Sequence, residues 1–262
     1  MPADSSTSEP VVRTAARLKR SADGSGVERG LVKPQSAVYL TEALSELNEG
    51  AAFLDRLTLD EINAVRRSAI NRTYEPGETV FLQGDRHNGI FIIESGRVRT
   101  YYAGPSGREI TLAYWTTGHF IGGPEVFGGG FHIWSGNAVE RSKLAFLPGS
   151  AAQELALRVP AFAMCLIEGL VAKGKCYSAL VHMLGTRSAT ERLAQLLLIL
   201  AKLDSEAVDS RMVVSRRITH EQLAGIVGVT RQWVTSTLAR FQERGIISIE
   251  RGTIVIERAD RL

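Results

Sequence analysis

Residues 219–244 read THEQLAGIVGVTRQWVTSTLARFQER, and this stretch decides how the C-terminal part of the chain folds. Its apolar residues recur at helical spacing on both sides of a break at Gly228–Val229. Thr230 is a suitable N-cap for the second helix. The expected core of the two helices consists of Leu223, Val227, Val229, Val234 and Leu238, with Ala224 as the small residue where the helices cross. The pattern predicts a helix-turn-helix, a unit whose second helix enters the major groove of DNA.

The sequence that follows predicts a wing. Residues 245–257, GIISIERGTIVIE, alternate apolar and polar side chains on either side of Arg251–Gly252. This alternation around a turn is typical of a β-hairpin. A small helical domain without a role in DNA binding is the alternative, but a winged helix accounts for both halves of the pattern. We therefore expect double-stranded DNA as a partner.

Polar side chains at the start of the second helix are the candidates for reading bases. Arginine pairs well with guanine and glutamine with adenine, so Arg231 and Gln232 are the first candidates, followed by Thr235 and Ser236. The remaining DNA contacts that we expect, mainly to phosphates, come from Thr230, Thr219, His220, Arg216 and Arg217.

A long helix is predicted upstream of this unit, over residues 161–184. Its apolar residues form one narrow, heptad-like stripe. The members of this stripe are Leu166, Leu170, Tyr177, Leu180 and Leu184. Such a helix usually packs against its symmetry mate, so we expect a homodimer; packing on its own domain would satisfy the same stripe. The apolar run over residues 193–203 is too short to span a bilayer and predicts a buried helix.

Nearer the N-terminus the hydrophobic period changes from helical to two. Residues 42–72 read as helical, with a capping box at Thr58 and Glu61. Short strand-like runs separated by turn residues then cover residues 78–85, 89–103, 108–115 and 142–148. These runs predict an antiparallel jelly roll, a fold that can enclose a small molecule. The expected fold class is α+β: a β-roll, a long dimerisation helix and a C-terminal winged helix-turn-helix.

This order of elements, over nearly all of residues 40–258, resembles the CRP/FNR family of bacterial transcription regulators. The resemblance is carried by YEPGETVFLQGDRHNGIFIIESGRVRTYY (74–102), by SATERLAQLLLILAKL (188–203) and by the helix-turn-helix itself. It implies a homodimer on a pseudo-palindromic operator, with a signal in the β-roll setting the angle of the DNA readers, and RNA polymerase as a further partner. The expected domains are residues 1–36 (a disordered arm), 37–159 (β-roll), 160–186 (dimerisation helix and hinge) and 187–262 (winged helix-turn-helix).

The glycine-rich stretch GGPEVFGGGFHIWSG (122–136) departs from the cyclic-AMP-binding members of that family. Those members hold the ribose with a Glu and the cyclic phosphate with an Arg–Ser pair. The matching positions here are Gly123, Ile133 and Trp134, and no arginine occurs in residues 109–140. A buried phosphate without a cation is poorly stabilised, so we do not expect cyclic AMP as the effector.

An apolar or aromatic small molecule suits this loop better. The expected pocket residues are Phe127, Phe131, His132, Ile133, Trp134, Tyr177 and Ser178. The alternative is a loop that folds onto its own aromatic residues and binds no ligand. Resemblance to carbon monoxide sensors would make His132 a heme ligand, although no second axial ligand is evident. A cupin-like metal enzyme would use His119, Glu125 and His132, but the usual His-x-His spacing is missing. We therefore expect no catalytic residue, no metal site and no resident cofactor.

Bulk composition narrows the remaining choices. The chain has 262 residues, a net charge of +3 and a pI of about 9.0, which is mild support for a polyanionic partner. Its two cysteines, Cys165 and Cys176, exclude a cluster held by four cysteines of the chain. We expect them to be apolar helix residues in a reducing compartment; a redox pair on one helix face is the alternative. No apolar signal segment is seen, so a cytoplasmic protein is expected.

Overall fold

The computed structural model describes residues 54, 56–105, 107–204, 212–216, 218–250 and 252–262. All of them fall within one compact unit, residues 34–262. The predicted arm over residues 1–36 lies outside the described residues, as do Arg217 and Arg251.

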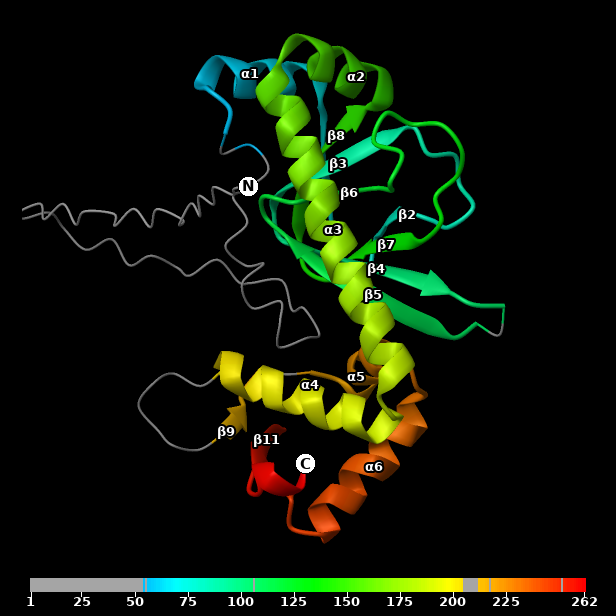
Figure 1. Ribbon diagram of the computed structural model, residues 1–262, viewed down its shortest axis with the longest axis vertical. Coiled ribbons are helices and arrows are strands. Elements are labelled where there is room, and N and C mark those ends of the chain that lie inside the picture. Colours follow the sequence, from blue (N-terminus) through cyan, green and yellow to red (C-terminus); the bar gives the residue numbers. More distant parts are fainter. Residues whose placement is uncertain (1–53, 55, 106, 205–211, 217, 251) are drawn as a thin grey trace, which may run out of the picture. The chain divides into compact units, whose positions relative to one another are not determined.

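Two four-stranded antiparallel sheets form the predicted β-roll (Figure 1). One sheet has the strand order β1-β8-β3-β6 and the other has the order β2-β7-β4-β5. The strands are β1 (Ile70–Tyr74), β2 (Thr79–Phe81), β3 (Gly89–Ser95), β4 (Arg97–Ala103), β5 (Glu109–Thr116), β6 (Phe120–Ile121), β7 (Ser135–Ala138) and β8 (Ser142–Pro148). Side chains from both sheets, among them Ile93, Val98, Trp115 and Leu144, are fully buried between them. The jelly roll expected from the sequence is confirmed.

The N-terminal edge of the β-roll differs from the helical pattern expected up to residue 72, whose first part, residues 42–53, lies outside the described residues. Helix α1 (Leu59–Ser68) begins with the predicted capping box, in which the Thr58 N–H donates to the Glu61 carboxylate at 2.8 Å. It ends at Ala69, whose backbone is extended, and β1 follows directly. The prediction of helix up to residue 72 was wrong because residues 70–74 pair along β8, a long-range partner that local periodicity does not reveal.

Two consecutive helices leave the β-roll (Figure 1). Helix α2 (Gly149–Arg158) was not expected from the sequence. Helix α3 (Pro160–Thr186) begins with Pro160 in its first turn, where a missing N–H costs nothing. Its inward residues extend the cores of both sheets, so α3 packs on its own β-roll.

The C-terminal part is a winged helix. Its elements are α4 (Ala189–Asp204), β9 (Met212–Val214), α5 (His220–Val227), α6 (Arg231–Glu243), β10 (Ile247–Glu250), β11 (Thr253–Ile256) and a short 3-10 helix (Ala259–Arg261). The predicted hairpin is formed by β10 and β11, and β9 adds an unexpected third strand to β11. Three leucines of α4, Leu193, Leu197 and Leu200, are completely buried, as expected for the apolar run. In the described part of the chain we find no helix that combines the length and hydropathy needed to cross a bilayer.

Candidate nucleic-acid interface and effector region

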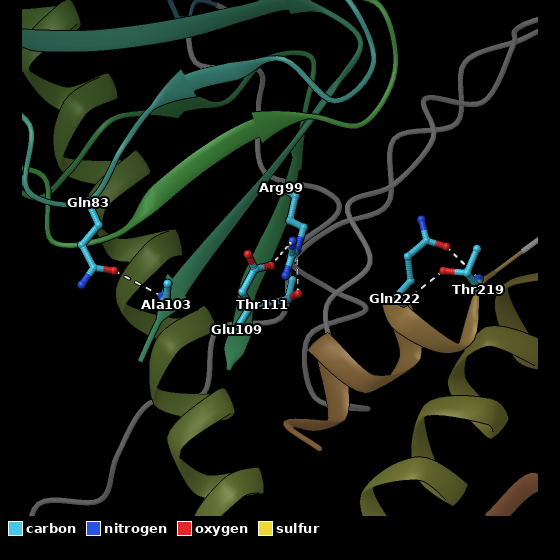
Figure 2. A network of polar contacts seen from close by, with 7 residues as sticks. All are labelled: Gln83, Arg99, Ala103, Glu109, Thr111, Thr219 and Gln222. Carbon is cyan, nitrogen blue, oxygen red and sulfur yellow. Dashed lines mark hydrogen bonds and ion pairs between the residues drawn. The ribbon is translucent and has the colours of Figure 1, made fainter. Parts of the chain in front are cut away.

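The two helices of the helix-turn-helix, α5 and α6, are fixed by local caps. The Thr219 hydroxyl accepts from the Gln222 N–H at 3.1 Å, and the Gln222 side chain accepts in return from the Thr219 N–H at 2.8 Å (Figure 2). Helix α5 ends at Gly228, whose φ of 74° lies in the left-handed region that favours glycine. The Thr230 hydroxyl then caps α6 by accepting from the Trp233 N–H at 3.2 Å. These caps set the turn between the helices.

One face of α6 is buried and the other is exposed. Its inward residues Val234, Leu238 and Phe241 pack in one core with α4, α5 and the wing, and Trp233 lies partly buried against that core. The opposite face carries all four predicted base readers, which are exposed: Arg231, Gln232, Thr235 and Ser236. The structure therefore brings these residues together on the first two turns of α6.

The four exposed side chains are not equivalent. The Ser236 hydroxyl donates to the Trp233 carbonyl, and the Thr235 hydroxyl donates to the Arg231 carbonyl. The Thr235 hydroxyl oxygen also lies 2.8 Å from Nδ1 of His220, and this contact joins α6 to the first residue of α5. Because these hydroxyls are engaged within the protein, Arg231 and Gln232 are the better candidates for direct base contacts.

The basic residues around the reader have specific positions. Arg216 forms an ion pair with the largely buried Asp204 and thereby joins the end of α4 to the segment before α5. Arg192, which the sequence analysis missed, donates to the carbonyls of Val227 and Arg187, both at 2.8 Å. It fastens the end of α3 to the end of α5. This role could not be predicted from the sequence, because it depends on which backbone carbonyls the fold places next to α4.

A cleft of about 720 Å³ lies beside the reader. Arg231 and Gln222 line it from the helix-turn-helix, and Arg99 and Arg108 line it from the β4–β5 hairpin. Arg99 is held by Glu109 at 2.8 Å and by the Thr111 hydroxyl at 2.9 Å (Figure 2). Arg231 is exposed and lines a cleft that its own β-roll also lines.

The glycines of residues 122–136 wrap around a histidine. A Cβ on Gly123 would lie 2.9 Å from Nε2 of His87, and one on Gly128 would lie 3.2 Å from the Asn88 carbonyl carbon. Gly128 also has a φ of 78°, and the Gly129 N–H donates to the His87 carbonyl at 2.9 Å. The loop therefore encloses protein atoms at a distance that only glycine allows.

Two protein families match this chain. The cyclic nucleotide-binding domain family matches residues 71–158, and the Crp-like helix-turn-helix domain family matches residues 191–262. The chain belongs to the CRP/FNR family of transcription regulators.

Known relatives share this architecture at low identity. The fumarate and nitrate reduction regulatory protein of Salmonella typhimurium is 23% identical over 210 residues, which are 80% of this chain and 82% of the relative. The cyclic AMP receptor protein of Thermus thermophilus is 26% identical over 211 residues, 80% of this chain and 94% of the relative. Among solved structures, the c-di-GMP responsive global regulator CLP of Xanthomonas campestris has a TM-score of 0.67 at 20% identity, covering 76% of this chain and 99% of that one. The last likeness concerns the fold alone.

Within this CRP/FNR regulator, the predicted effector residues are divided between two environments. Trp134 and Tyr177 lie together, with ring centroids 5.4 Å apart, and Trp115 lies 6.5 Å from Tyr177. By contrast, Phe127, Phe131 and Ile133 are 43%, 60% and 51% exposed, and Ser178 is exposed on α3. His132 is buried inside the loop. The seven residues do not line one enclosed pocket in this structure.

The His132 environment does not fit a heme. Its Nδ1 lies 2.8 Å from the Gly122 carbonyl oxygen, and its ring stacks on Phe81 with centroids 4.4 Å apart. His87 covers it from another side at 4.5 Å. A macrocycle needs the space that these rings fill. Among the described residues, no three His, Cys, Asp or Glu side chains are arranged to hold a metal ion.

Both cysteines are buried and face the core of their own chain. Cys165 packs with the residues of α2 and β3, whereas Cys176 packs against Trp115 and its neighbours. Burial raises the pKa of the Cys165 thiol, and it raises the pKa of Cys176 to about 12. Thiolates, the reactive form, are therefore disfavoured at both positions.

The sequence analysis missed Lys173 as a functional candidate. Its side chain is 6% exposed, and its ammonium nitrogen lies 3.6 Å from the ring centroid of Phe120 and 4.6 Å from that of Trp115. Burial lowers the pKa of this amine to about 7. A lysine in an otherwise apolar helix stripe is its only sequence signal.

Proposed function

We propose that this regulator binds DNA sequence-specifically as a homodimer on a pseudo-palindromic site, with α6 as the recognition helix. The observation that carries the proposal is the exposed pair Arg231 and Gln232 on the first turn of α6, a helix whose opposite face is fixed in the core. Such a helix can enter the major groove without unfolding its own domain. Thr219, Thr230 and His220, at the starts of the two helices, and Arg216 and Arg217 before them are the proposed backbone contacts.

The proposed dimer forms through α3, but through a different stripe from the one expected. The stripe predicted from the sequence packs inside the chain: Leu166 and Leu180 are 3% and 5% exposed. A second stripe is exposed and apolar, and it repeats at alternating spacings of three and four residues. This exposed α3 stripe consists of Met164, Ile167, Val171, Gly174, Ser178, Val181 and Gly185. The side chains of Ile167 and Val181 are 51% and 70% exposed, so a second copy of α3 is the proposed cover.

The β-roll is the proposed sensor domain, responding to a small molecule other than cyclic AMP or to none. Supporting this, residues 122–136 contain no lysine or arginine, and Trp115, Trp134 and Tyr177 fill the space between the β-roll and α3 with aromatic rings. Phe127, Phe131, His132, Ile133 and Ser178 remain proposed contributors to an effector region that forms when the loop moves. RNA polymerase is the proposed protein partner at the promoter.

The test is to select an operator from a random duplex library with the full-length protein and then compare variants. Arg231→Ala should cost about 1–3 kcal/mol on the selected operator and relax the preference at one base pair of each half-site. The matched control is Arg244→Ala, at the far end of the same helix. It removes an exposed arginine without touching the first turn.

In the Arg231→Ala variant, the affinity for the operator should fall, whereas the affinity for random duplex should change much less. Equal losses on both DNAs would make Arg231 a phosphate contact and would contradict its role as a base reader. Failure to enrich any sequence would contradict the proposed function as a whole.

A further inference from the structure

Thr235 lies on the exposed face of α6, but its hydroxyl group is engaged within the protein. The hydroxyl oxygen lies 3.1 Å from the Arg231 carbonyl oxygen and 2.8 Å from Nδ1 of His220, the first residue of α5. A carbonyl oxygen only accepts, and a hydroxyl has a single hydrogen to donate. Both contacts are therefore satisfied together when Thr235 donates to Arg231 and His220 donates its Nδ1–H to the Thr235 oxygen.

These two hydrogen bonds fix the orientation of the Thr235 side chain. One partner belongs to the preceding turn of α6 and the other to α5, so the side chain is held by both helices of the helix-turn-helix. The substituents on Cβ are staggered, so a fixed hydroxyl also fixes the γ-methyl group. Because both partners of the hydroxyl lie within the protein, the methyl group is what Thr235 offers to an external partner.

A methyl group in the major groove is the mark of thymine. The other three bases present only hydrogen-bonding groups there, and a threonine methyl packs well against the thymine methyl. Thr235 lies one helical turn after Arg231 on the same face of α6. Four residues advance a helix by about 6 Å and successive base pairs are about 3.4 Å apart, so the two side chains reach bases within about two base pairs of each other.

A free hydroxyl would give a different preference. Serine and threonine hydroxyls pair with the donors or the acceptors of several bases, so they discriminate poorly. At Thr235 this ambiguity is removed, because His220 occupies the oxygen and the Arg231 carbonyl takes the hydrogen. The neighbouring Ser236 is a contrast: its hydroxyl donates to the Trp233 carbonyl at 3.0 Å, and it has no methyl group to offer.

We propose that Thr235 reads the 5-methyl group of a thymine in each half-site and that His220 is the positioning residue that directs the methyl group toward it. The inference rests on the proposed function and names the base chemistry of one position in the operator. His220 thus determines specificity through Thr235, in addition to its proposed contact with the DNA backbone.

The experiment measures binding of the full-length protein to the selected operator, in which each thymine of one half-site is replaced in turn by deoxyuridine. This replacement removes only the 5-methyl group. We expect at least one replacement to weaken binding by the parent protein about fourfold, the effect of uncovering one methyl group. The ratio of the affinities for thymine and deoxyuridine at that position is the methyl preference.

Variants of Thr235 assign the methyl preference to one side chain. Thr235→Ser keeps the hydroxyl and loses the methyl group, so the preference at that position should be lost. Thr235→Val should keep it, because valine presents a methyl group in either orientation. Ser236→Ala is the matched control on the same turn of α6, and it should also keep the preference.

Variants of His220 test the positioning role. His220→Ala frees the Thr235 hydroxyl and should lower the methyl preference, whereas His220→Asn keeps an N–H donor near the place of Nδ1 and should restore it. In the Thr235→Val background, His220→Ala should leave the preference unchanged, since no hydroxyl remains to be positioned. A role of His220 in folding or phosphate binding alone would change the affinity for both DNAs equally.

The proposal is overturned if the selected half-site holds no thymine, if no replacement by deoxyuridine weakens binding, or if Thr235→Ser keeps the methyl preference. An unchanged preference in His220→Ala would overturn the positioning role of His220. All of these outcomes are measured on an operator that the protein binds. They are therefore distinct from failure to enrich any sequence, which contradicts the proposed function itself.

Discussion

His87 occupies the centre of the loop that the sequence marks by its glycines. It is 1% exposed, and neither ring nitrogen has a hydrogen-bond partner within the described structure. Burial, and then the nearby His132, lower its pKa from the usual 6.5. The conformational freedom of the glycines is used to close backbone around this ring, which is a different use from holding a phosphate.

The histidine makes a prediction about acid stability. The unfolded chain binds a proton at His87 near pH 6.5, whereas the folded chain resists it, so the free energy of unfolding should fall as pH drops below about 6.5. His87 alone contributes at most about 1.4 kcal/mol per pH unit in this window. Urea melts of the parent and of His87→Phe between pH 7.5 and 5 measure the slope.

We expect the slope to be shallower in His87→Phe and unchanged in His182→Gln, which removes an exposed histidine of α3. Identical slopes in the parent protein and His87→Phe would show that other groups control the acid transition.

At the level of elements, α3 carries two apolar stripes, one packed inside its own chain and one proposed to meet a second copy. The inward stripe joins the cores of the β-roll and the winged helix, where Leu180 and Met183 pack with α4 and α5. The outward stripe leaves Ile167 and Val181 exposed. A helix with apolar residues on two sides gives no local signal of which side meets the rest of its own chain.

Two substitutions one residue apart separate these tasks. Val181→Asp should leave folding intact and shift the protein to monomers, because it puts a charge in the exposed α3 stripe. Leu180→Ala should leave the association state unchanged and cost about 2–5 kcal/mol of stability, because it opens a cavity in the core.

Light scattering for mass and urea denaturation for stability check this pair. A dimeric Val181→Asp protein at micromolar concentration would argue that α3 pairs elsewhere or does not pair.

For the whole molecule, the proposed dimer with one recognition helix in each chain determines how the operator must be built. A dimer presents two copies of α6, and each needs its own half-site about one helical turn from the other. Linking two weak contacts raises the overall affinity without any new contact.

We expect a duplex with both half-sites to bind on the order of 100-fold tighter than a duplex with one. The dependence of affinity on salt should be correspondingly steeper for the full operator, because more phosphates are neutralised. Fluorescence anisotropy at several salt concentrations measures both, with a duplex of shifted half-site spacing as control. Equal affinity for one and two half-sites would contradict a dimeric reader.

The sequence alone established the parts whose signals are local. The cap at Thr230, the break at Gly228 and the alternation of residues 245–257 predicted the winged helix correctly, and the turn residues between short strands predicted the β-roll. These features depend on hydrogen bonds and side-chain periodicity within a few residues, so they can be read without knowing the fold.

Only the tertiary structure decided which surfaces meet. It assigned the predicted stripe of α3 to the chain's own core, paired residues 70–74 with β8, and closed the glycine loop on His87. It also buried Lys173 between two rings far from it in sequence. These outcomes depend on contacts between segments many residues apart, and the burial they impose sets the exposure and the pKa of each side chain.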